Sequence, residues 1–151
     1  MTYPDAVQEL IDLLEKHWNM RNTGSRRPTI RKAWDSKRTT QMMARPNQDL
    51  IVVLETSRPV KLAGNGGAGN DAFTDHAKLQ IDIRVVQDES QAYRVRNEVL
   101  RILTSNMQTG TLSFSKIIPR FDDHRNLSDK SVNLFRYLVP AELRTHRRKF
   151  T

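Results

Sequence analysis

The sequence predicts an α+β domain: a largely antiparallel four-stranded sheet with two amphipathic helices packed on one face, and with long basic and glycine-rich loops. Two segments have apolar residues at helical spacing, and four short segments have the composition or the alternation of strands. The strands come in pairs with helices between them, which is typical of α+β domains. A length of 151 residues suits a single core, so residues 1–151 are expected to form one domain.

The opening segment predicts the first helix, an amphipathic one of about four turns. Thr2 and Asp5 have the spacing of a capping box, and Pro4 lies in the expected first turn. The apolar residues that recur at helical spacing, and that we expect to contact the core, are Val7, Leu10, Ile11, Leu14 and Trp18.

Residues 21–48 predict an extended basic connection, because they show no sustained period and contain glycine and proline breakers. Within it, residues 29–34 are a candidate short strand. The stretch up to residue 46 holds eight Lys/Arg against one acid, and such a stretch attracts phosphate or an acidic surface. A basic segment that is solvated, or that contacts another subunit, is an equally good interpretation. The candidates for contact with DNA or with an acidic partner are Arg26, Arg27, Arg31, Lys32, Lys37 and Arg38.

Residues 50–57 form a short β-branched run that predicts a buried strand, and Pro59 ends it. Residues 77–86 alternate between apolar and polar side chains and predict the clearest strand in the chain. The two strands can pair as a hairpin. Their glycine-rich connection, a hairpin loop over residues 61–77, is much longer than the usual two to five residues.

Residues 88–106 predict the second amphipathic helix, with Asp88 or Ser90 as its N-cap. Its expected core face consists of Ala92, Val95, Val99, Ile102 and Leu103, and its expected polar face of Arg94, Asn97, Glu98 and Arg101. Residues 111–119 and 132–143 predict two closing strands, joined by a polar loop. Residues 144–151 are expected to form a basic C-terminal tail.

Residues 64–69, with the sequence GNGGAG, match the G-x-G-x-x-G pattern of dinucleotide-binding loops. That pattern acts where a strand leads into a helix, because the helix N-terminus presents amide groups and a favourable dipole to the pyrophosphate. Here a strand follows instead. The segment is therefore expected to be the flexible part of a long hairpin loop, and neither a nucleotide nor any other cofactor is expected.

Catalytic signatures are missing from the sequence: it contains no G-x-S-x-G elbow, no P-loop and no H-E-x-x-H motif. Asp82 and Arg84 lie on a predicted strand and Glu55 on the preceding one, but the lysine that a metal-dependent nuclease would need is missing from this spacing. An exposed sheet face is the better interpretation of Asp82 and Arg84. We therefore expect no enzymatic activity.

Two pairings of carboxylates with histidine suggest a metal site, namely Asp75 beside His76, and residues 122–123 beside His124. Acidic residues and histidines in loops are more often solvated, so no metal is expected. The chain contains no cysteine, which excludes disulfides and thiolate zinc sites. The opening residues lack the features of a signal peptide, and no segment approaches the roughly 20 apolar residues that span a bilayer.

The order of the predicted elements matches a known pattern. An N-terminal amphipathic helix is followed by the strand DLIVVLETS, the strand AKLQIDIRVV, the helix SQAYRVRNEVLRIL directly after it, and two closing strands. This order resembles that of the tail terminator (tail-completion) and related neck proteins of tailed bacteriophages. The resemblance covers residues 3–20 and 48–143, and it depends on element order and on the junction at residues 79–103. The basic insertion after the first helix is long for that family.

The resemblance implies a structural virion protein of the tail or neck, assembled in the host cytoplasm, that forms a hexameric ring. The ring would cap the tail tube and join it to the head connector, with DNA passing through its lumen and with no catalytic residues. The implied partners are further copies of this chain, the tail-tube protein and head-connector or neck proteins, without a membrane. The alternative function is a basic, sequence-independent nucleic-acid-binding module. The residues expected at subunit or partner interfaces are Trp34, Met42, Met43, Gly64, Gly66, Gly69 and Phe73.

Overall fold

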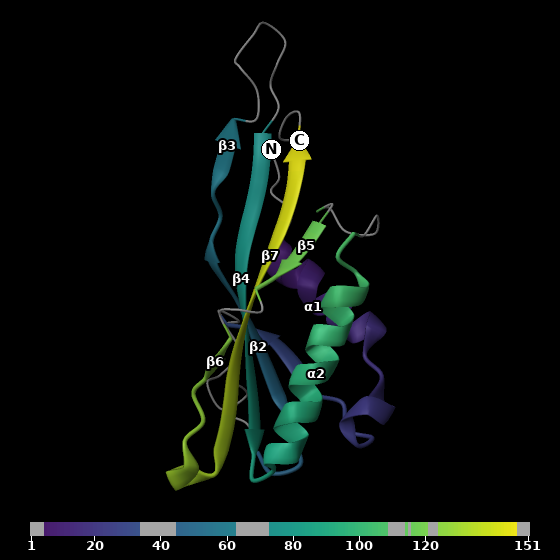
Figure 1. Ribbon diagram of the computed structural model, residues 1–151, viewed down its shortest axis with the longest axis vertical. Coiled ribbons are helices and arrows are strands. Elements are labelled where there is room, and N and C mark those ends of the chain that lie inside the picture. The colour runs from purple at the N-terminus through teal and green to yellow at the C-terminus, as the bar shows by residue number, and fades with distance from the viewer. Residues whose placement is uncertain are drawn as a thin grey trace, which may run out of the picture.

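The residues that the computed structural model describes are 5–33, 45–62, 73–108, 114, 116–120 and 124–147. They form an α+β fold, so the predicted class is confirmed. Two α-helices, α1 (Ala6–His17) and α2 (Glu89–Ser105), lie on one face of a mixed β-sheet (Figure 1). Two short 3-10 helices, η1 (Met20–Thr23) and η4 (Lys130–Val132), lie in connections. The described strands are β1 (Thr29–Lys32), β2 (Leu50–Ser57), β3 (Val60–Leu62), β4 (Phe73–Val86), β5 (Lys116–Pro119), β6 (Arg125–Asn126) and β7 (Leu134–Arg147).

Strands β4 and β7 form the centre of the sheet, as an antiparallel pair of 14 residues each. β2 and β3 pair with successive parts of the other edge of β4, and β5 and β6 pair with successive parts of the other edge of β7. At one end the sheet extends beyond both helices (Figure 1). We call this end the arm, and it consists of β3, residues 73–76 of β4 and residues 144–147 of β7.

The predicted number of four strands is wrong, because the described sheet has seven strands. The sheet is largely antiparallel, with one parallel pair, β1 with β2. β1 lies within residues 21–48, where the sequence predicts an extended connection, and it confirms the candidate strand at residues 29–34. This strand is a weak sequence signal because it has only four residues and one buried apolar side chain, Ile30.

The arm also replaces two predicted loops. β3 and the first residues of β4 pair within residues 61–77, and β7 continues to Arg147, through the first four of the eight residues of the predicted basic tail. Asp75 and Thr145 lie opposite each other, and both are buried. They occupy positions where strand alternation would require apolar residues, so the pattern hides these extensions.

Helix α1 begins at Ala6 because the Asp5 side chain caps it. The Asp5 carboxylate accepts a hydrogen bond from the amide nitrogen of Gln8 at 3.0 Å, which satisfies one of the free amide groups of the first turn. Asp5 therefore takes the capping position that the sequence pattern assigns to Thr2, which lies outside the described residues. The buried residues of the helix are Ala6, Leu10, Ile11, Leu13 and Leu14.

Helix α2 begins after Asp88, whose carboxylate accepts a hydrogen bond from the amide nitrogen of Gln91 at 3.0 Å. Asp88, rather than Ser90, is therefore the N-cap. All five residues of the predicted core face are fully buried. Glu98, which the pattern places on the polar face, is only 2 % exposed, so that part of the prediction is wrong.

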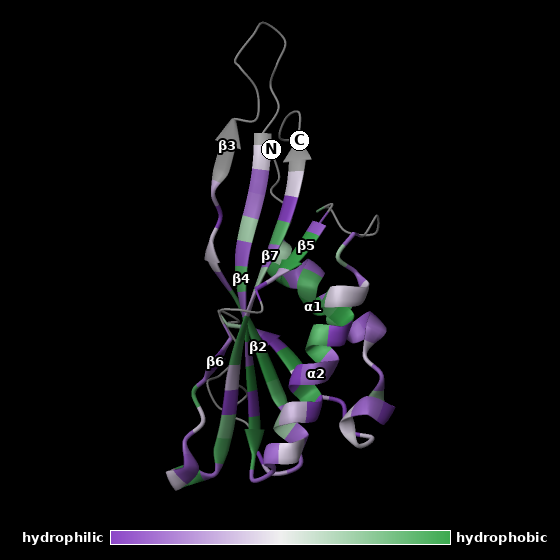
Figure 2. Ribbon diagram, in the orientation of Figure 1, coloured by the Kyte–Doolittle hydropathy of each residue, from purple (hydrophilic) through white to green (hydrophobic). Residues whose placement is uncertain are grey.

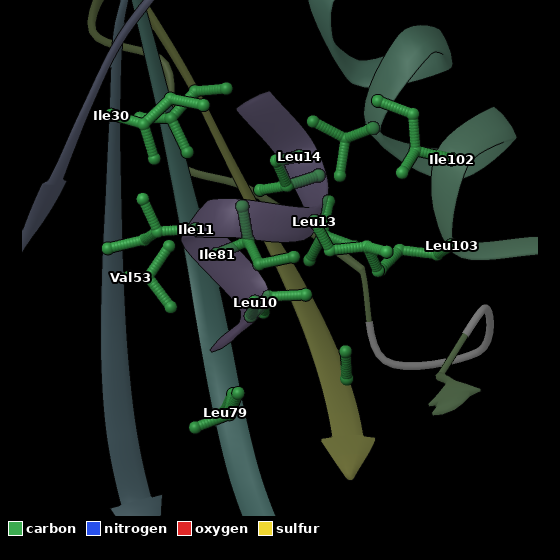
Figure 3. Close-up of a cluster of buried hydrophobic side chains, with 14 of the residues drawn as sticks. Leu10, Ile11, Leu13, Leu14, Ile30, Val53, Leu79, Ile81, Ile102 and Leu103 are labelled. Carbon is green, nitrogen blue, oxygen red and sulfur yellow. The ribbon is translucent and has the colours of Figure 1, made fainter. Parts of the chain in front are cut away.

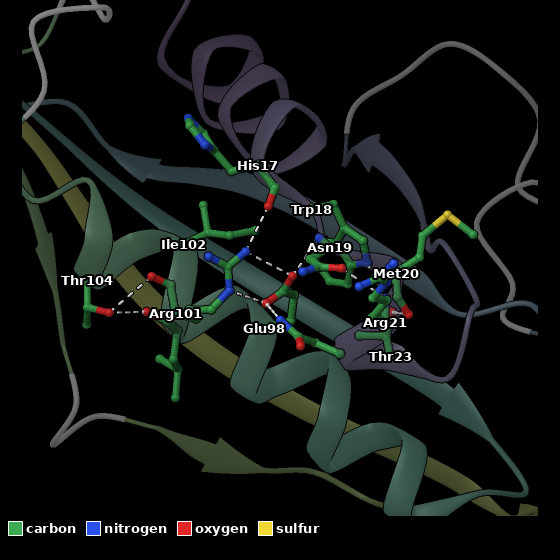
Figure 4. A network of polar contacts seen from close by, with 12 residues as sticks. His17, Trp18, Asn19, Met20, Arg21, Thr23, Glu98, Arg101, Ile102 and Thr104 are labelled. Atoms are coloured by element: carbon green, nitrogen blue, oxygen red, sulfur yellow. Dashed lines mark hydrogen bonds and ion pairs between the residues drawn. The ribbon is translucent and has the colours of Figure 1, made fainter.

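Glu98 is buried because it joins α2 to the segment that follows α1 (Figure 4). Its Oε2 accepts a hydrogen bond from the amide nitrogen of Asn19 at 2.7 Å, and its Oε1 accepts one from Nδ2 of Asn22 at 3.0 Å. The Arg101 guanidinium donates to the same carboxylate and also to the carbonyl oxygen of His17 at 2.8 Å. Burial acts to raise the pKa of Glu98, but these hydrogen bonds outweigh burial and hold the pKa below its usual value.

The hydrophobic core lies between the helices and the face of the sheet that they cover. Ile81 of β4 and Val53 of β2 point toward α1, whose Leu10 and Leu13 contact this layer, while Leu103 approaches from α2 (Figure 3). Burying each such side chain stabilises the fold by about 1.5–3 kcal/mol. Hydrophobic residues gather beside the helices, whereas the coloured part of the arm, residues 74–76 of β4 and 144–145 of β7, is more hydrophilic (Figure 2).

Candidate functional site

The face of the sheet opposite the helices, which we call the helix-free face, carries charged side chains from five of the seven described strands. Side chains alternate between the two faces along a strand, and residues directly opposite in neighbouring strands share a face. Because Ile81 and Ile83 lie in the core, the even-numbered residues of β4 and their partners on β7 lie on the helix-free face. The register extends this assignment to β1, β5 and β6.

Cations outnumber acids on this face. Among the strand residues whose side chains are described, seven Lys/Arg and two acids lie there, and Arg120, which directly follows β5, bonds to one of the acids. The eight cations are Arg31, Lys78, Arg84, Lys116, Arg120, Arg125, Arg136 and Arg144, and the two acids are Asp82 and Glu142.

The Asp82 carboxylate holds two guanidinium groups. Arg136 donates from Nε to Oδ1 at 3.0 Å and from Nη2 to Oδ2 at 2.8 Å, and Arg84 donates from Nη2 to Oδ2 at 2.8 Å. Asp82 is only 8 % exposed, because the two guanidinium groups lie against it. The prediction that Asp82 is exposed on the sheet face is therefore wrong. Two positive charges share one negative charge, and the cluster keeps a net positive charge.

The Glu142 carboxylate forms a second cluster of the same kind. Arg120 donates to Oε1 from Nε at 2.8 Å and from Nη2 at 2.6 Å, His76 Nε2 lies 2.6 Å from Oε2, and Nη2 of Arg144 lies 3.6 Å from Oε2. Burial acts to raise the pKa of Glu142, but the contacts with Arg120 and His76 outweigh burial and hold the pKa below its usual value. Glu142 is therefore ionised at neutral pH.

A cavity of about 430 Å³ lies beside the Glu142 cluster. Its walls come from β4, from β7 and from the turn that precedes β3. The described residues that line it are Pro59, Thr74, His76, Lys78 and Arg144. Across the described residues, the Lys78 ammonium group has neither an ion pair nor a hydrogen-bond partner. Lysine and arginine side chains donate hydrogen bonds and accept none, so this lining suits an anion.

Two of the cations predicted to contact DNA or an acidic partner bond to other parts of the chain. Arg26 donates from Nη2 to Oδ1 of the buried Asp49 at 2.6 Å, and from Nη1 to Asn47 at 3.1 Å. Arg27 donates to the carbonyl oxygen of Glu15 at 2.5 Å, which ties the segment to α1. Both side chains therefore stabilise the connection that carries them.

The next two predicted cations lie on opposite faces of β1. Lys32 donates to Oδ2 of Asp5 at 2.5 Å, beside the start of α1. Arg31 pairs in register with Val52 and so lies on the helix-free face, where its Nε has no hydrogen-bond partner among the described residues. Of these four cations, only Arg31 joins the other charges of that face.

Of the remaining predicted site residues, only Phe73 lies in the described part of the chain. It begins β4 in the arm, opposite Leu62 on one side and Arg147 on the other. Residues 64–69 lie in the sequence between β3 and β4, which pair as antiparallel strands. The prediction that a strand, and not a helix, follows the glycine pattern is therefore confirmed. The site residues that lie outside the described part of the chain are Trp34, Lys37, Arg38, Met42, Met43, Gly64, Gly66 and Gly69.

The candidate metal-binding residues that the structure describes do not come together around a common site. Asp75 and His76 are neighbours on β4, so they point to opposite faces: Asp75 bonds to Arg58 at 2.7 Å and His76 to Glu142. Residues 122–123 lie outside the described part. Within the described ranges no group of three or more His, Asp or Glu residues is placed to hold a metal ion, and no helix there has the length and apolarity needed to cross a membrane.

Sequence reasoning misses the two carboxylate clusters because each depends on pairing between strands. The alternation along β4 places Lys78, Asp82 and Arg84 on one face, and this much is visible in the sequence. Only the register of β4 with β7 brings Arg136 and Glu142 to the same face. No protein-family model and no curated protein matches this chain, so its functional interpretation depends on its own geometry and charge.

Proposed function

We propose that this chain is a structural virion protein that forms a ring at the head–tail junction of a tailed bacteriophage, as a tail terminator or neck component. Such a subunit would cap the tail tube, join it to the head connector and catalyse no reaction. The element order supports the proposal: α1, β2, β4, α2 directly after β4, and the closing strands follow one another as in that family.

The observation that carries the proposal is the arm, which projects beyond both helices (Figure 1). It consists of β3 and β7 paired on either side of the first residues of β4. A three-stranded ribbon of this kind needs an apolar face, or another element packed on it, to be stable in water. A neighbouring subunit packed on the arm would supply the missing layer, and in a closed ring each subunit can do so for the next.

The alternative function, nucleic-acid binding through residues 21–46, receives less support from the described part of that segment. Arg26, Arg27 and Lys32 each bond to another part of the chain. A basic segment that tracks a phosphate backbone needs its charges available for the phosphates. These bonds instead favour a segment that packs against its own domain.

The oligomeric mass of the purified protein tests the proposal. Light scattering after size-exclusion chromatography is expected to give a mass six times that of one chain, and negative-stain images are expected to show rings. A protein that remains monomeric at high concentration, and that does not bind to tail tubes, would contradict the proposal.

A variant with a shortened arm separates ring formation from folding. Lys61 lies opposite Thr74 in the β3–β4 hairpin, so residues 62–73 can be replaced by Asn-Gly, a favoured two-residue hairpin turn. We expect this variant to keep its circular dichroism spectrum and to become monomeric. The control is Val132→Ser, which removes an exposed apolar side chain at the opposite end of the sheet and should leave the mass unchanged. A shortened variant that still forms rings would show that the arm is not the subunit contact.

A further inference from the structure

We propose that the helix-free face binds the sugar–phosphate backbone of DNA, and that the cavity lined by His76, Lys78 and Arg144 is one of its phosphate sites. The inference rests on the proposed function for its setting, because DNA passes through the ring of such a protein. Its chemistry depends only on the charges of this face.

The charge balance is the first argument. Among the side chains that the structure describes, eight Lys/Arg stand against two carboxylates on the helix-free face, within a chain whose net charge is +8. Charges of one sign gathered on one surface attract a polyanion and speed its association. Contacts with phosphates are independent of sequence and sensitive to salt, which suits DNA that moves past the surface.

The arrangement of the guanidinium groups is the second argument. Asp82 holds Arg84 and Arg136, and Glu142 holds Arg120 and approaches Arg144. Each carboxylate fixes the direction of its arginines while leaving the cluster a net positive charge. An arginine whose planar fork is already oriented loses little conformational entropy when it binds a phosphate in a bidentate manner.

The spacing of the two clusters fits an extended ligand. Glu142 lies opposite Lys78, and Asp82 lies four residues further along β4. At the rise of a β-strand, the two clusters are about 13 Å apart. Lys116 and Arg125 are exposed at the β5 and β6 edge of the same face. Positive charge therefore continues along the sheet and is not confined to one pocket.

The cavity beside the Glu142 cluster adds a specific site. The side chain of Lys78 lines it without an ion-pair or hydrogen-bond partner in the described ranges, and Arg144 adds a second positive charge to the lining. Its volume of about 430 Å³ leaves room for a phosphate group together with ordered water.

The composition of the face favours DNA over an acidic protein. The centre of a protein–protein interface is depleted in charged residues and enriched in aromatic ones. Interfaces with DNA are more polar and far more positively charged. The helix-free face presents charged side chains at its centre as well as at its edges.

The test removes only cations that bond to no other described side chain. Lys78, Lys116 and Arg125 are exposed and have no described ion pair, so changing all three to glutamine disrupts no described side-chain interaction. Binding to a short fluorescent DNA duplex is measured by anisotropy between about 50 and 200 mM salt. We expect the triple variant to bind about tenfold more weakly at low salt, and the slope of log affinity against log salt to fall by about 0.9 for each phosphate that is no longer neutralised.

The matched control removes the same charge from the helix side of the molecule. Lys16, Arg21 and Arg94 are exposed on α1, η1 and α2, and their change to glutamine should leave the salt slope unchanged. Equal weakening by both triple variants, or no binding of the wild type at low salt, would overturn the inference. Binding to polyglutamate as tight as to DNA would overturn it in favour of an acidic protein partner. A monomer that binds DNA through this face would contradict the proposed ring and leave this inference standing.

Discussion

The two faces of the sheet use the same strands in different ways. Along β4, Ile81 and Ile83 are fully buried beneath the helices, while Lys78 and Arg84 alternate with them on the helix-free face. Burial of apolar surface supplies the stability of the first face. Exposed cations such as Lys78, which forms no described ion pair, contribute little stability, since even a surface ion pair is typically worth only about 0–1 kcal/mol. Such cations leave positive charge for the DNA contact that we propose.

The largest expected effect comes from a change on the helix-covered face. Ile81→Ala removes a side chain with no exposed surface from the layer between β4 and α1. We expect the free energy of unfolding to fall by about 2–5 kcal/mol, because the change removes apolar burial and leaves a cavity. Urea titration followed by circular dichroism measures this decrease. A decrease of only about 0.5 kcal/mol, as for an exposed residue, would show that the core lies elsewhere.

A smaller effect is expected where α2 joins the segment after α1. Glu98→Ala leaves the Asn19 amide and the Arg101 guanidinium without their shared acceptor. A hydrogen bond to a charged group contributes about 1.5–3 kcal/mol, so the free energy of unfolding should fall by about that amount. Asn97→Ala, at an exposed position of the same helix, is the control and should change it by no more than about 0.5 kcal/mol. Equal effects at the two positions would contradict the role given to Glu98.

The start of α2 provides a weaker test on the same side of the sheet. Asp88→Ala removes the N-cap that accepts a hydrogen bond from Gln91, at an expected cost of about 0.5–2 kcal/mol in unfolding free energy. Ser90→Ala, at the alternative position suggested by the sequence, should cost less, since Ser90 lies inside the helix. Thermal unfolding compares the stability of the two variants, and Asp88→Ala should be the less stable. A lower stability for Ser90→Ala would contradict the observed cap.

The smallest expected effect is a dependence on pH. The pKa of Glu98 in the folded protein is lower than its usual value of 4.5, so its ionised form stabilises the fold. This contribution is fully present above about pH 4.5 and disappears as the pH falls through the lower folded pKa. The difference in unfolding free energy between the wild type and Glu98→Gln should therefore shrink on acidification. A difference that grows toward low pH would contradict the assignment.

The helix-covered face can largely be predicted from the sequence, because its information is local. The five-residue core stripe of α2 and the alternation around Ile81 and Ile83 are visible in single segments, and all of these residues are buried. Glu98 is the exception. Its burial depends on Asn19 and Asn22, which are more than 70 positions away, and helical spacing alone carries no sign of them.

The helix-free face cannot be predicted in the same way. Asp82 contacts Arg136 only because β4 and β7 pair in one particular register. The cations that stand out in the sequence are clustered along the chain in residues 21–46, yet Arg26 and Lys32 are bound within the fold. The cations that gather in space come from five strands and from Arg120. Clustering along the chain and clustering on the surface are therefore different properties here.

Two neighbouring residues of β4 test the division between the faces most directly. Lys78 lies on the helix-free face, and Leu79 is 2 % exposed in the core. Substitutions at these neighbouring positions of one strand therefore compare the two faces of the sheet. We measure how tightly each variant, Lys78→Ala and Leu79→Ala, binds a DNA duplex, as a dissociation constant. Both are measured at one low salt concentration at which both proteins are folded. We expect Lys78→Ala to bind DNA more weakly than the wild type and Leu79→Ala to bind as the wild type does, although the unfolding free energy of Leu79→Ala should be lower by about 2–5 kcal/mol. Unchanged binding by Lys78→Ala, or equal weakening by both variants, would contradict the account.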